Sequence, residues 1–214
     1  MTARPAARYA RFRMDLLDAL VWTGTLTFAA TGALVAIRAN FDLIGVLVLA
    51  AVTAIGGGSI RDVIVGILPP SSFTNEPMLW AVAGTGLLVF LTHRKMNPES
   101  RLLYFLDTLG LAIFTALGAQ TGVNFGMGMW GTVFAGAVSG VGGGVMRDVL
   151  TDKVPGVFYR AGDFYASAGA LGALSFYFIQ PLGTNAALTA AILITFGVRV
   201  GSRYLRLELP SPRS

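Results

Sequence analysis

The chain has 214 residues, of which 54% are hydrophobic and 13% are charged, with a net charge of +5 and a mean hydropathy of +0.67. Soluble domains carry about 25% charged residues, so this composition excludes an ordinary soluble domain, which would need a more polar surface. It predicts an all-α integral membrane protein in contact with a lipid bilayer, because the alternating pattern of a membrane β-barrel is missing from the sequence.

Residues that support enzymatic or nucleic-acid chemistry are also scarce. The sequence has no cysteine, which excludes disulfides and thiolate metal sites, and its single histidine, His93, precedes the basic residues Arg94 and Lys95. The sequence contains no nucleophile elbow, metal-ligand cluster or phosphate loop. The arginines flank apolar runs, as topology signals do. We therefore expect no enzyme, no cofactor and no nucleic-acid partner.

Seven apolar segments follow one another, and most of them approach the roughly 20 residues that a helix needs to cross a bilayer. They are expected near residues 16–37, 41–66, 78–92, 103–124, 127–150, 163–180 and 185–202. The third and the sixth are the shortest. Only compact turns join the segments, so residues 1–214 are predicted to form a single membrane domain.

The chain contains an internal repeat with an offset of 86 residues. The octet Gly56–Val63 returns as Gly142–Val149, and the same offset places Phe28 on Phe114. The predicted units are repeat one at about 15–95, repeat two at about 101–181 and a final helix at about 185–205. Each repeat holds three segments, an odd number, so the second repeat is expected to enter the membrane from the opposite side.

The glycine triplets Gly56–Gly58 and Gly142–Gly144 are the leading candidates for a functional site. Glycine weakens a helix and lets a backbone or an ion approach closely, so both triplets are expected to unwind. Four freed carbonyl oxygens could then coordinate potassium or sodium transiently, those of Gly56, Gly57, Gly142 and Gly143. Alternatively, backbone amides could face a substrate carboxylate, or the glycines could simply allow close helix packing.

An Arg-Asp pair follows each triplet, Arg61 and Asp62 in the first repeat, Arg147 and Asp148 in the second. Adjacent helical residues point about 100° apart, so we expect pairing across the repeats, of Arg61 with Asp148 and of Arg147 with Asp62. In an ion pathway the carboxylates would supply negative potential and the arginines would fix the structure of a gate.

Other polar residues within the apolar runs receive secondary roles. Thr53, Ser59 and Gln120 are possible pore-lining groups. Asp107 lies near the start of its segment and is expected to be an interfacial helix cap. We therefore expect the ion pathway to depend mainly on the two triplets and their Arg-Asp pairs.

Basic residues predict the orientation. The loops on one side carry Arg38, then Arg94, Lys95 and Arg101, then Lys153 and Arg160, and the C-terminal arginines lie on that side too. This side is expected to be cytoplasmic in a multi-pass protein of the plasma membrane, with the C-terminus inside. The arginines at positions 4, 8, 11 and 13 argue against this orientation, but the loops agree with one another.

The stretches Phe28–Ala33, Asp42–Val48, Gly56–Val63, Gly110–Gly118 and Gly142–Leu150 closely resemble the bacterial family called UPF0126. That family carries the glycine-transporter domain name and is related to trimeric intracellular cation (TRIC) channels. The resemblance implies a homotrimer of seven-helix protomers, each with two inverted three-helix repeats, a last helix and its own pore. The glycine-kinked second and fifth helices form the middle of that pore.

The resemblance implies a channel for monovalent cations that prefers potassium. A secondary transporter of glycine or another small amino acid is the alternative, and a structural membrane protein without transport is a third reading. Animal relatives have lysine and acidic residues beside the first triplet, where this chain has Thr53, Ala54 and Ile55. Lipid regulation of the animal kind is therefore not expected.

Overall fold

A computed structural model of the chain describes residues 16–93, 100–158 and 164–207. These residues form eight α-helices and two short 3-10 turns without any strand, which confirms the predicted all-α class. In chain order the elements are α1 (Leu16–Arg38), α2 (Leu43–Ile64), α3 (Ser71–Thr74), α4 (Glu76–Thr92), α5 (Ser100–Asn124), α6 (Met129–Leu150), η1 (Gly156–Phe158), α7 (Tyr165–Ile179), η2 (Gln180–Leu182) and α8 (Thr184–Tyr204). The seven predicted segments coincide with the seven longer helices, and only α3 is not predicted from the sequence.

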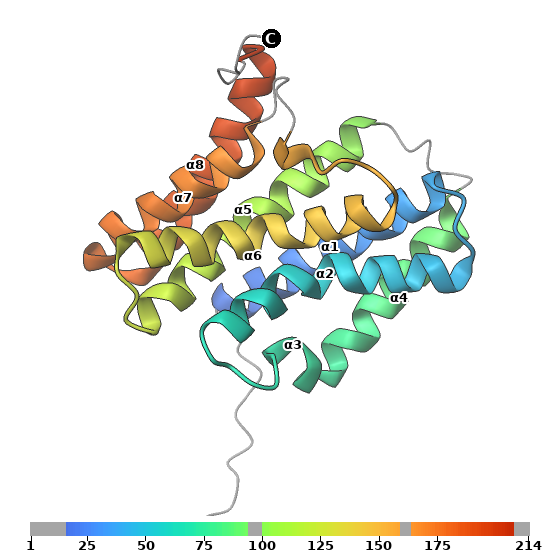
Figure 1. Cartoon of the computed structure of the whole chain (residues 1–214), viewed down its shortest axis with the longest axis horizontal. Coiled ribbons are helices and arrows are strands. Elements are labelled where there is room, and N and C mark those ends of the chain that lie inside the picture. The colour runs from blue at the N-terminus through green and yellow to red at the C-terminus, as the bar shows by residue number, and fades with distance from the viewer. Residues whose placement is uncertain (1–15, 94–99, 159–163, 208–214) are drawn as a thin grey trace, which may run out of the picture.

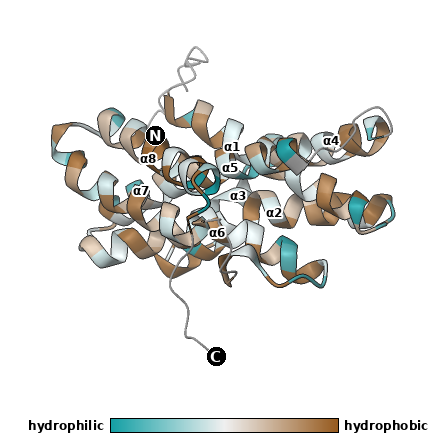
Figure 2. Ribbon diagram, turned by 90° about the horizontal axis from the view of Figure 1, so that it is seen from above, coloured by the Kyte–Doolittle hydropathy of each residue, from teal (hydrophilic) through white to brown (hydrophobic). Residues whose placement is uncertain are grey.

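The helices have the character of a multi-pass membrane protein. Five of them, α1, α2, α5, α6 and α8, are long and apolar enough to cross a membrane. α4 has 17 residues and α7 has 15, as expected for the two shortest segments. Hydrophobic residues recur along all of the long helices (Figure 2), and some of the largest are exposed, such as Trp80 at 77% and Trp130 at 76%. Such exposure suits a lipid environment, where these side chains need no protein cover.

Two pairs of helices form the centre of the bundle. α1 lies against α5, and α2 lies against α6 (Figure 1). α4 packs against α1 and α2, and α7 packs against α5 and α6 in the corresponding way. α8 lies against α5 and α7, on the side of the bundle away from α4 (Figure 1). The contacts of the first three long helices are thus repeated by the next three, and α8 adds to the second set only.

The turns that end the helices also recur at the 86-residue offset. Asn40, between α1 and α2, has a φ of 59°, and Gly126, between α5 and α6, has a φ of 70°. Gly66 follows α2 with a φ of 84°, and Asp152 follows α6 with a φ of 56°. Glycine, asparagine and aspartate adopt this left-handed conformation more readily than other residues. The residue types at these four positions therefore help to explain where the helices end.

The glycine triplets do not unwind. α2 continues without interruption through Gly56–Gly58, and α6 continues through Gly142–Gly144. The prediction of unwound backbone is therefore wrong for both triplets. The physical reason lies in the packing, because the helices meet at these glycines.

Candidate functional site

The backbones of α2 and α6 approach each other most closely at the middle glycine of each triplet. A Cβ atom on Gly57 would overlap the carbonyl oxygen of Ser139 in α6, and one on Gly143 would overlap the carbonyl oxygen of Thr53 in α2. These two contacts are equivalent under the 86-residue offset. No side chain fits between the two backbones, so hydrogen is the only substituent that permits this crossing.

The other glycines of the first triplet have more room. A Cβ on Gly56 would meet only the flexible end of Met146, and one on Gly58 would have the guanidinium of Arg61 as its nearest neighbour, at 3.8 Å. Gly58 could therefore accept a methyl group without a clash. The first triplet thus contains one position fixed by backbone contact and two that are not.

The second triplet is more tightly enclosed. A Cβ on Gly142 would lie 3.0 Å from the Cα of Gly57, and one on Gly144 would overlap the hydroxyl of Tyr165 at the start of α7. All three glycines of this triplet therefore face other parts of the chain at close range. The two triplets match in sequence but differ in their surroundings.

Arg61 pairs with its own neighbour Asp62. Its Nη2 donates to Asp62 Oδ1 at 2.6 Å and its Nε donates to the same oxygen at 3.0 Å. The other carboxylate oxygen accepts from the backbone amide of Ser71 at 2.9 Å and from its hydroxyl at 2.6 Å. The expected pairing of Arg61 with Asp148 is wrong, because the long arginine side chain folds back over the adjacent position.

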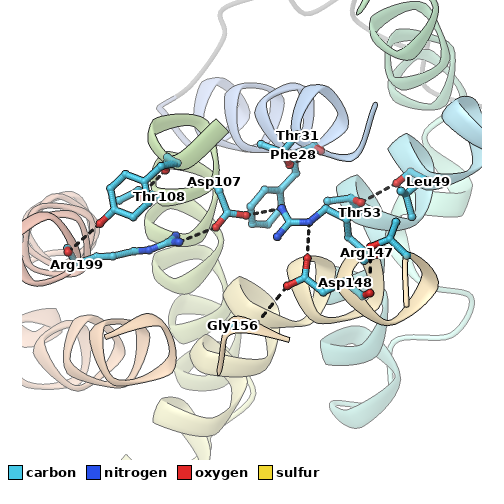
Figure 3. Close-up of polar contacts among 12 residues, drawn as sticks. Phe28, Thr31, Leu49, Thr53, Asp107, Thr108, Arg147, Asp148, Gly156 and Arg199 are labelled. Atoms are coloured by element: carbon cyan, nitrogen blue, oxygen red, sulfur yellow. Dashed lines mark hydrogen bonds and ion pairs between the residues drawn. The ribbon is translucent and has the colours of Figure 1, made fainter. Parts of the chain in front are cut away.

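Arg147 has two carboxylate partners and not the predicted Asp62. Its Nε donates to Asp148 Oδ1 at 2.9 Å, and its Nη1 donates to Asp107 Oδ1 at 2.6 Å. The second oxygen of Asp107 lies 2.8 Å from Nη2 of Arg199, in α8. Figure 3 shows the Asp107 carboxylate between these two guanidinium groups, with Asp148 on the other side of Arg147. One buried carboxylate therefore ties together α5, α6 and α8.

This cluster corrects the role predicted for Asp107. It is not an interfacial cap, because the side chain is only 6% exposed and holds two arginines inside the bundle. Arg199 was not expected in this cluster, because the C-terminal arginines were interpreted as topology signals. A signal was present, since Arg199 falls within the predicted segment 185–202 and an arginine inside a membrane helix usually has a carboxylate partner.

Two cavities lie at opposite ends of the bundle. The first has a volume of about 400 Å³, and its lining includes Leu17, Val21, Arg61, Ser71, Gln120 and Asn124. The second has a volume of about 260 Å³ and is lined by Arg38, Leu103, Tyr104, Asp107, Arg147, Asp148, Gly156, Tyr165, Arg199 and Arg203. α1 lines the first cavity near its start and the second at its end. Along α5 the second cavity ends at Asp107 and the first begins at Phe114, so the buried residues between them separate the two.

The linings of the two cavities are partly equivalent under the offset. Leu17 corresponds to Leu103, Arg61 to Arg147, and Asn124 to Arg38. Their charge differs, because Arg61 is the one charged side chain among the described residues of the first lining. The second lining has four arginines and two aspartates.

The three predicted pore-lining residues occupy different places. Gln120 lines the first cavity. The hydroxyl of Thr53 donates to the Leu49 carbonyl at 2.7 Å, and that of Ser59 donates to the Ile55 carbonyl at 2.8 Å, both within α2. Neither of these hydroxyl residues contributes to the two cavities described above, so a pore-lining role for them stays a prediction.

Comparison with known proteins gives consistent matches over most of the chain. A family model described as "Glycine transporter" matches residues 18–94 and again residues 104–181, so the two matches begin 86 residues apart. A UPF0126 membrane protein of Deinococcus radiodurans is 42% identical over 203 residues, which cover 92% of this chain and 94% of the relative. The UPF0126 inner membrane protein YadS of Escherichia coli is 33% identical, over 88% of this chain and 92% of its own length.

Solved structures with the same fold are cation channels. A structure described under conductance through TRIC cation channels has a TM-score of 0.85 and 31% identity, and the match covers 94% of this chain and 98% of that one. The TRIC trimeric intracellular cation channel orthologue from Rhodobacter sphaeroides has a TM-score of 0.84 and 30% identity, over 90% of this chain and 99% of its own. The likeness extends over nearly the whole of each chain.

Proposed function

This chain belongs to the UPF0126 family of membrane proteins, and from its fold and its two cavities we propose that it is a channel for monovalent cations that prefers potassium. The observation that carries the proposal is the near-complete likeness to TRIC cation channels at a TM-score of 0.85. At 31% identity this likeness extends to sequence as well as fold. The preference for potassium rests on the family resemblance.

The proposed pathway runs through each protomer, from one cavity to the other. Residues of α2 close to the α2–α6 crossing, Ala54 and Gly58, line the first cavity, and Arg147 of α6 lines the second, which supports a pathway past the crossing. The two triplets, with Arg61, Asp62, Arg147 and Asp148, would form the gate in this pathway. Ion binding at carbonyls of Gly56, Gly57, Gly142 or Gly143 requires the helices to open locally, because these groups lie within unbroken helix.

The membrane arrangement in this proposal has seven spans and two inverted repeats. The pairing of α4 with α1 and α2, and of α7 with α5 and α6, supports the repeats, as do the turns that recur at the offset. The C-terminus would be cytoplasmic and the membrane would be the inner membrane, where YadS is described. We propose a homotrimer, because the Rhodobacter sphaeroides neighbour is described as trimeric.

A carrier of glycine or another small amino acid is the second candidate. The specific observation in its favour is the first cavity, where the guanidinium of Arg61 lies among the polar groups of Ser71, Asn75, Gln120 and Asn124. A guanidinium can hold a carboxylate, and neutral amides can accept from an ammonium group. The family description names glycine transport.

The test is electrical recording of the purified protein in a planar bilayer with a gradient of KCl. Discrete current steps that reverse near the potassium equilibrium potential are the expected result. The proposal fails if the bilayer stays silent while liposomes with the same protein take up glycine with saturation. Gly57→Leu should abolish the current even in the fraction of the protein that still assembles like the unmodified oligomer, and Gly58→Ala is the matched control from the same triplet.

A further inference from the structure

The charges that line the second cavity oppose the passage of cations. Its described lining carries four arginines, Arg38, Arg147, Arg199 and Arg203, against only two carboxylates. Rings of basic side chains favour anions in pores, and rings of acidic ones favour cations. Some feature of this cavity must therefore weaken the field of the arginines if potassium passes through it.

Asp107 lies where its carboxylate can weaken the field of the lining arginines. Each of its two carboxylate oxygens holds a different guanidinium, Arg147 at 2.6 Å and Arg199 at 2.8 Å. All three side chains are buried, so little solvent screens their charges from one another. The other lining carboxylate, Asp148, also contacts Arg147 but lies 3.4 Å from the amide of Gly156 with its second oxygen. Asp107 is thus the carboxylate that offsets two arginines at once.

The described lining of the first cavity has no carboxylate in the position of Asp107. The position equivalent to Asp107 is Val21, which lines the first cavity with an apolar side chain. Arg199 has no equivalent either, because α8 lies outside the two repeats. The Asp107–Arg199 pair is therefore an addition to the second half of the molecule and not a consequence of its symmetry.

We propose that Asp107 sets the charge selectivity of the second cavity, and that α8 contributes through Arg199, which Asp107 must offset. This inference rests on the proposed channel function. The carboxylate keeps both guanidiniums turned toward itself, so that the field in the cavity stays permissive for cations. Without it, Arg199 would lose this ion pair and Arg147 would keep only Asp148, so the lining would gain one net positive charge and concentrate anions in a poorly solvated cavity.

The experiment measures the ratio of potassium to chloride permeability from the reversal potential of the full-length protein in a KCl gradient. Asp107→Asn adds one net positive charge to the lining, Arg199→Gln removes one, and the double variant restores the original sum. We expect Asp107→Asn to lower the ratio of potassium to chloride permeability by roughly threefold to tenfold. One unit charge in the lining changes the electrostatic energy of an ion in the cavity by more than the thermal energy, and salt screening reduces this change. Arg199→Gln should leave the ratio equal or higher, and the double variant should return it to that of the unmodified protein.

The three variants separate a charge effect from a structural one. If the cluster only fastens α8 to the bundle, Arg199→Gln and the double variant should damage the protein as much as Asp107→Asn does, and the ratio should not follow the net charge. An unchanged ratio in a correctly assembled Asp107→Asn protein overturns the proposal, as does a fall in Arg199→Gln. If Asp107→Asn does not assemble, Arg199→Gln and the double variant still test the order of the ratios. A silent unmodified protein contradicts the channel function itself, which is a different outcome.

Discussion

Phe28 and Phe114 stack on each other with ring centroids 5.3 Å apart and planes 13° from parallel, although 86 residues separate them. They occupy equivalent positions in the two halves of the chain, so each contacts its own counterpart. Such a contact between counterparts supports the proposed inverted repeats. The crossing of α2 and α6 shows the same equivalence. Gly57 lies against the carbonyl oxygen of Ser139, and Gly143 lies against that of Thr53, its counterpart at the 86-residue offset.

The first prediction concerns this crossing. Gly57→Ala and Gly143→Ala should each lower the free energy of unfolding by about 1–3 kcal/mol, the usual cost of forcing an extra methyl into a packed interior. The cause is overlap with a backbone carbonyl, which cannot move aside as a flexible side chain can. Thermal unfolding of the detergent-solubilised protein measures the effect.

Gly58→Ala is the control for this prediction. Its new methyl group would be 3.8 Å from the nearest atom of Arg61, and alanine favours a helix over glycine by about 1 kcal/mol. We expect this variant to be as stable as the unmodified protein or slightly more stable. Equal losses in Gly57→Ala and Gly58→Ala would show that helix weakening, and not backbone contact, is what the triplet provides.

The second prediction concerns the contact between the end of α2 and the start of α3. The two hydrogen bonds from Ser71 to Asp62 hold α3 against α2. Ser71→Ala removes the hydroxyl bond but keeps the amide bond, and should cost about 1.5–3 kcal/mol because the acceptor is charged. Hydrogen exchange should accelerate in residues 66–75. Thr74→Ala, which removes only a local bond to the Ser71 carbonyl, should leave exchange in that segment nearly unchanged.

Much of this fold follows from hydropathy alone. The seven predicted segments agree with the helices because a membrane helix needs a long apolar run, and charged or turn-forming residues interrupt each run. The end of α6 at Leu150 and the end of α8 at Tyr204 illustrate this agreement. The 86-residue offset is also visible in the sequence, because equivalent positions of the two repeats hold residues of matching types.

The site was harder to predict for physical reasons. A glycine triplet has the same sequence signature whether it unwinds or lets two helices touch, and only the neighbouring helix decides between these outcomes. The partner of Arg147 was unpredictable for another reason, since Asp107 lies 40 residues away and position 21 in the first repeat holds valine. Sequence symmetry predicts symmetric partners, whereas α8 breaks the symmetry.

The third prediction separates the two candidate functions. Arg61→Gln removes the one charged side chain that lines the first cavity among the described residues. Asp62 keeps its two hydrogen bonds from Ser71 but loses both bonds from Arg61, so thermal unfolding of the variant is measured beside its transport. In a cation channel, potassium conductance should be retained or rise by about twofold to threefold, because a repulsive charge has been removed. In a carrier, glycine uptake should be lost, because the guanidinium is the group that would hold the carboxylate.

The fourth prediction concerns the contact between Gly144 and Tyr165. The Tyr165 hydroxyl is buried and has no hydrogen-bond partner in the described part of the chain, and a methyl group on Gly144 would overlap it. Gly144→Ala should therefore destabilise the protein by about 1–3 kcal/mol. Tyr165→Phe should be neutral or slightly stabilising, because it removes a buried polar group that lacks a partner.

The double variant Gly144→Ala/Tyr165→Phe tests this contact directly. Deleting the hydroxyl makes room for the new methyl group, so the double variant should recover most of the stability lost in Gly144→Ala. A coupling of about 1 kcal/mol or more in this double-mutant cycle is expected for residues in contact. Strictly additive effects would mean that the cost of Gly144→Ala arises elsewhere, for example from Arg147, whose guanidinium would lie 3.7 Å from the new methyl carbon. Thermal unfolding of all four proteins in one detergent decides between the two.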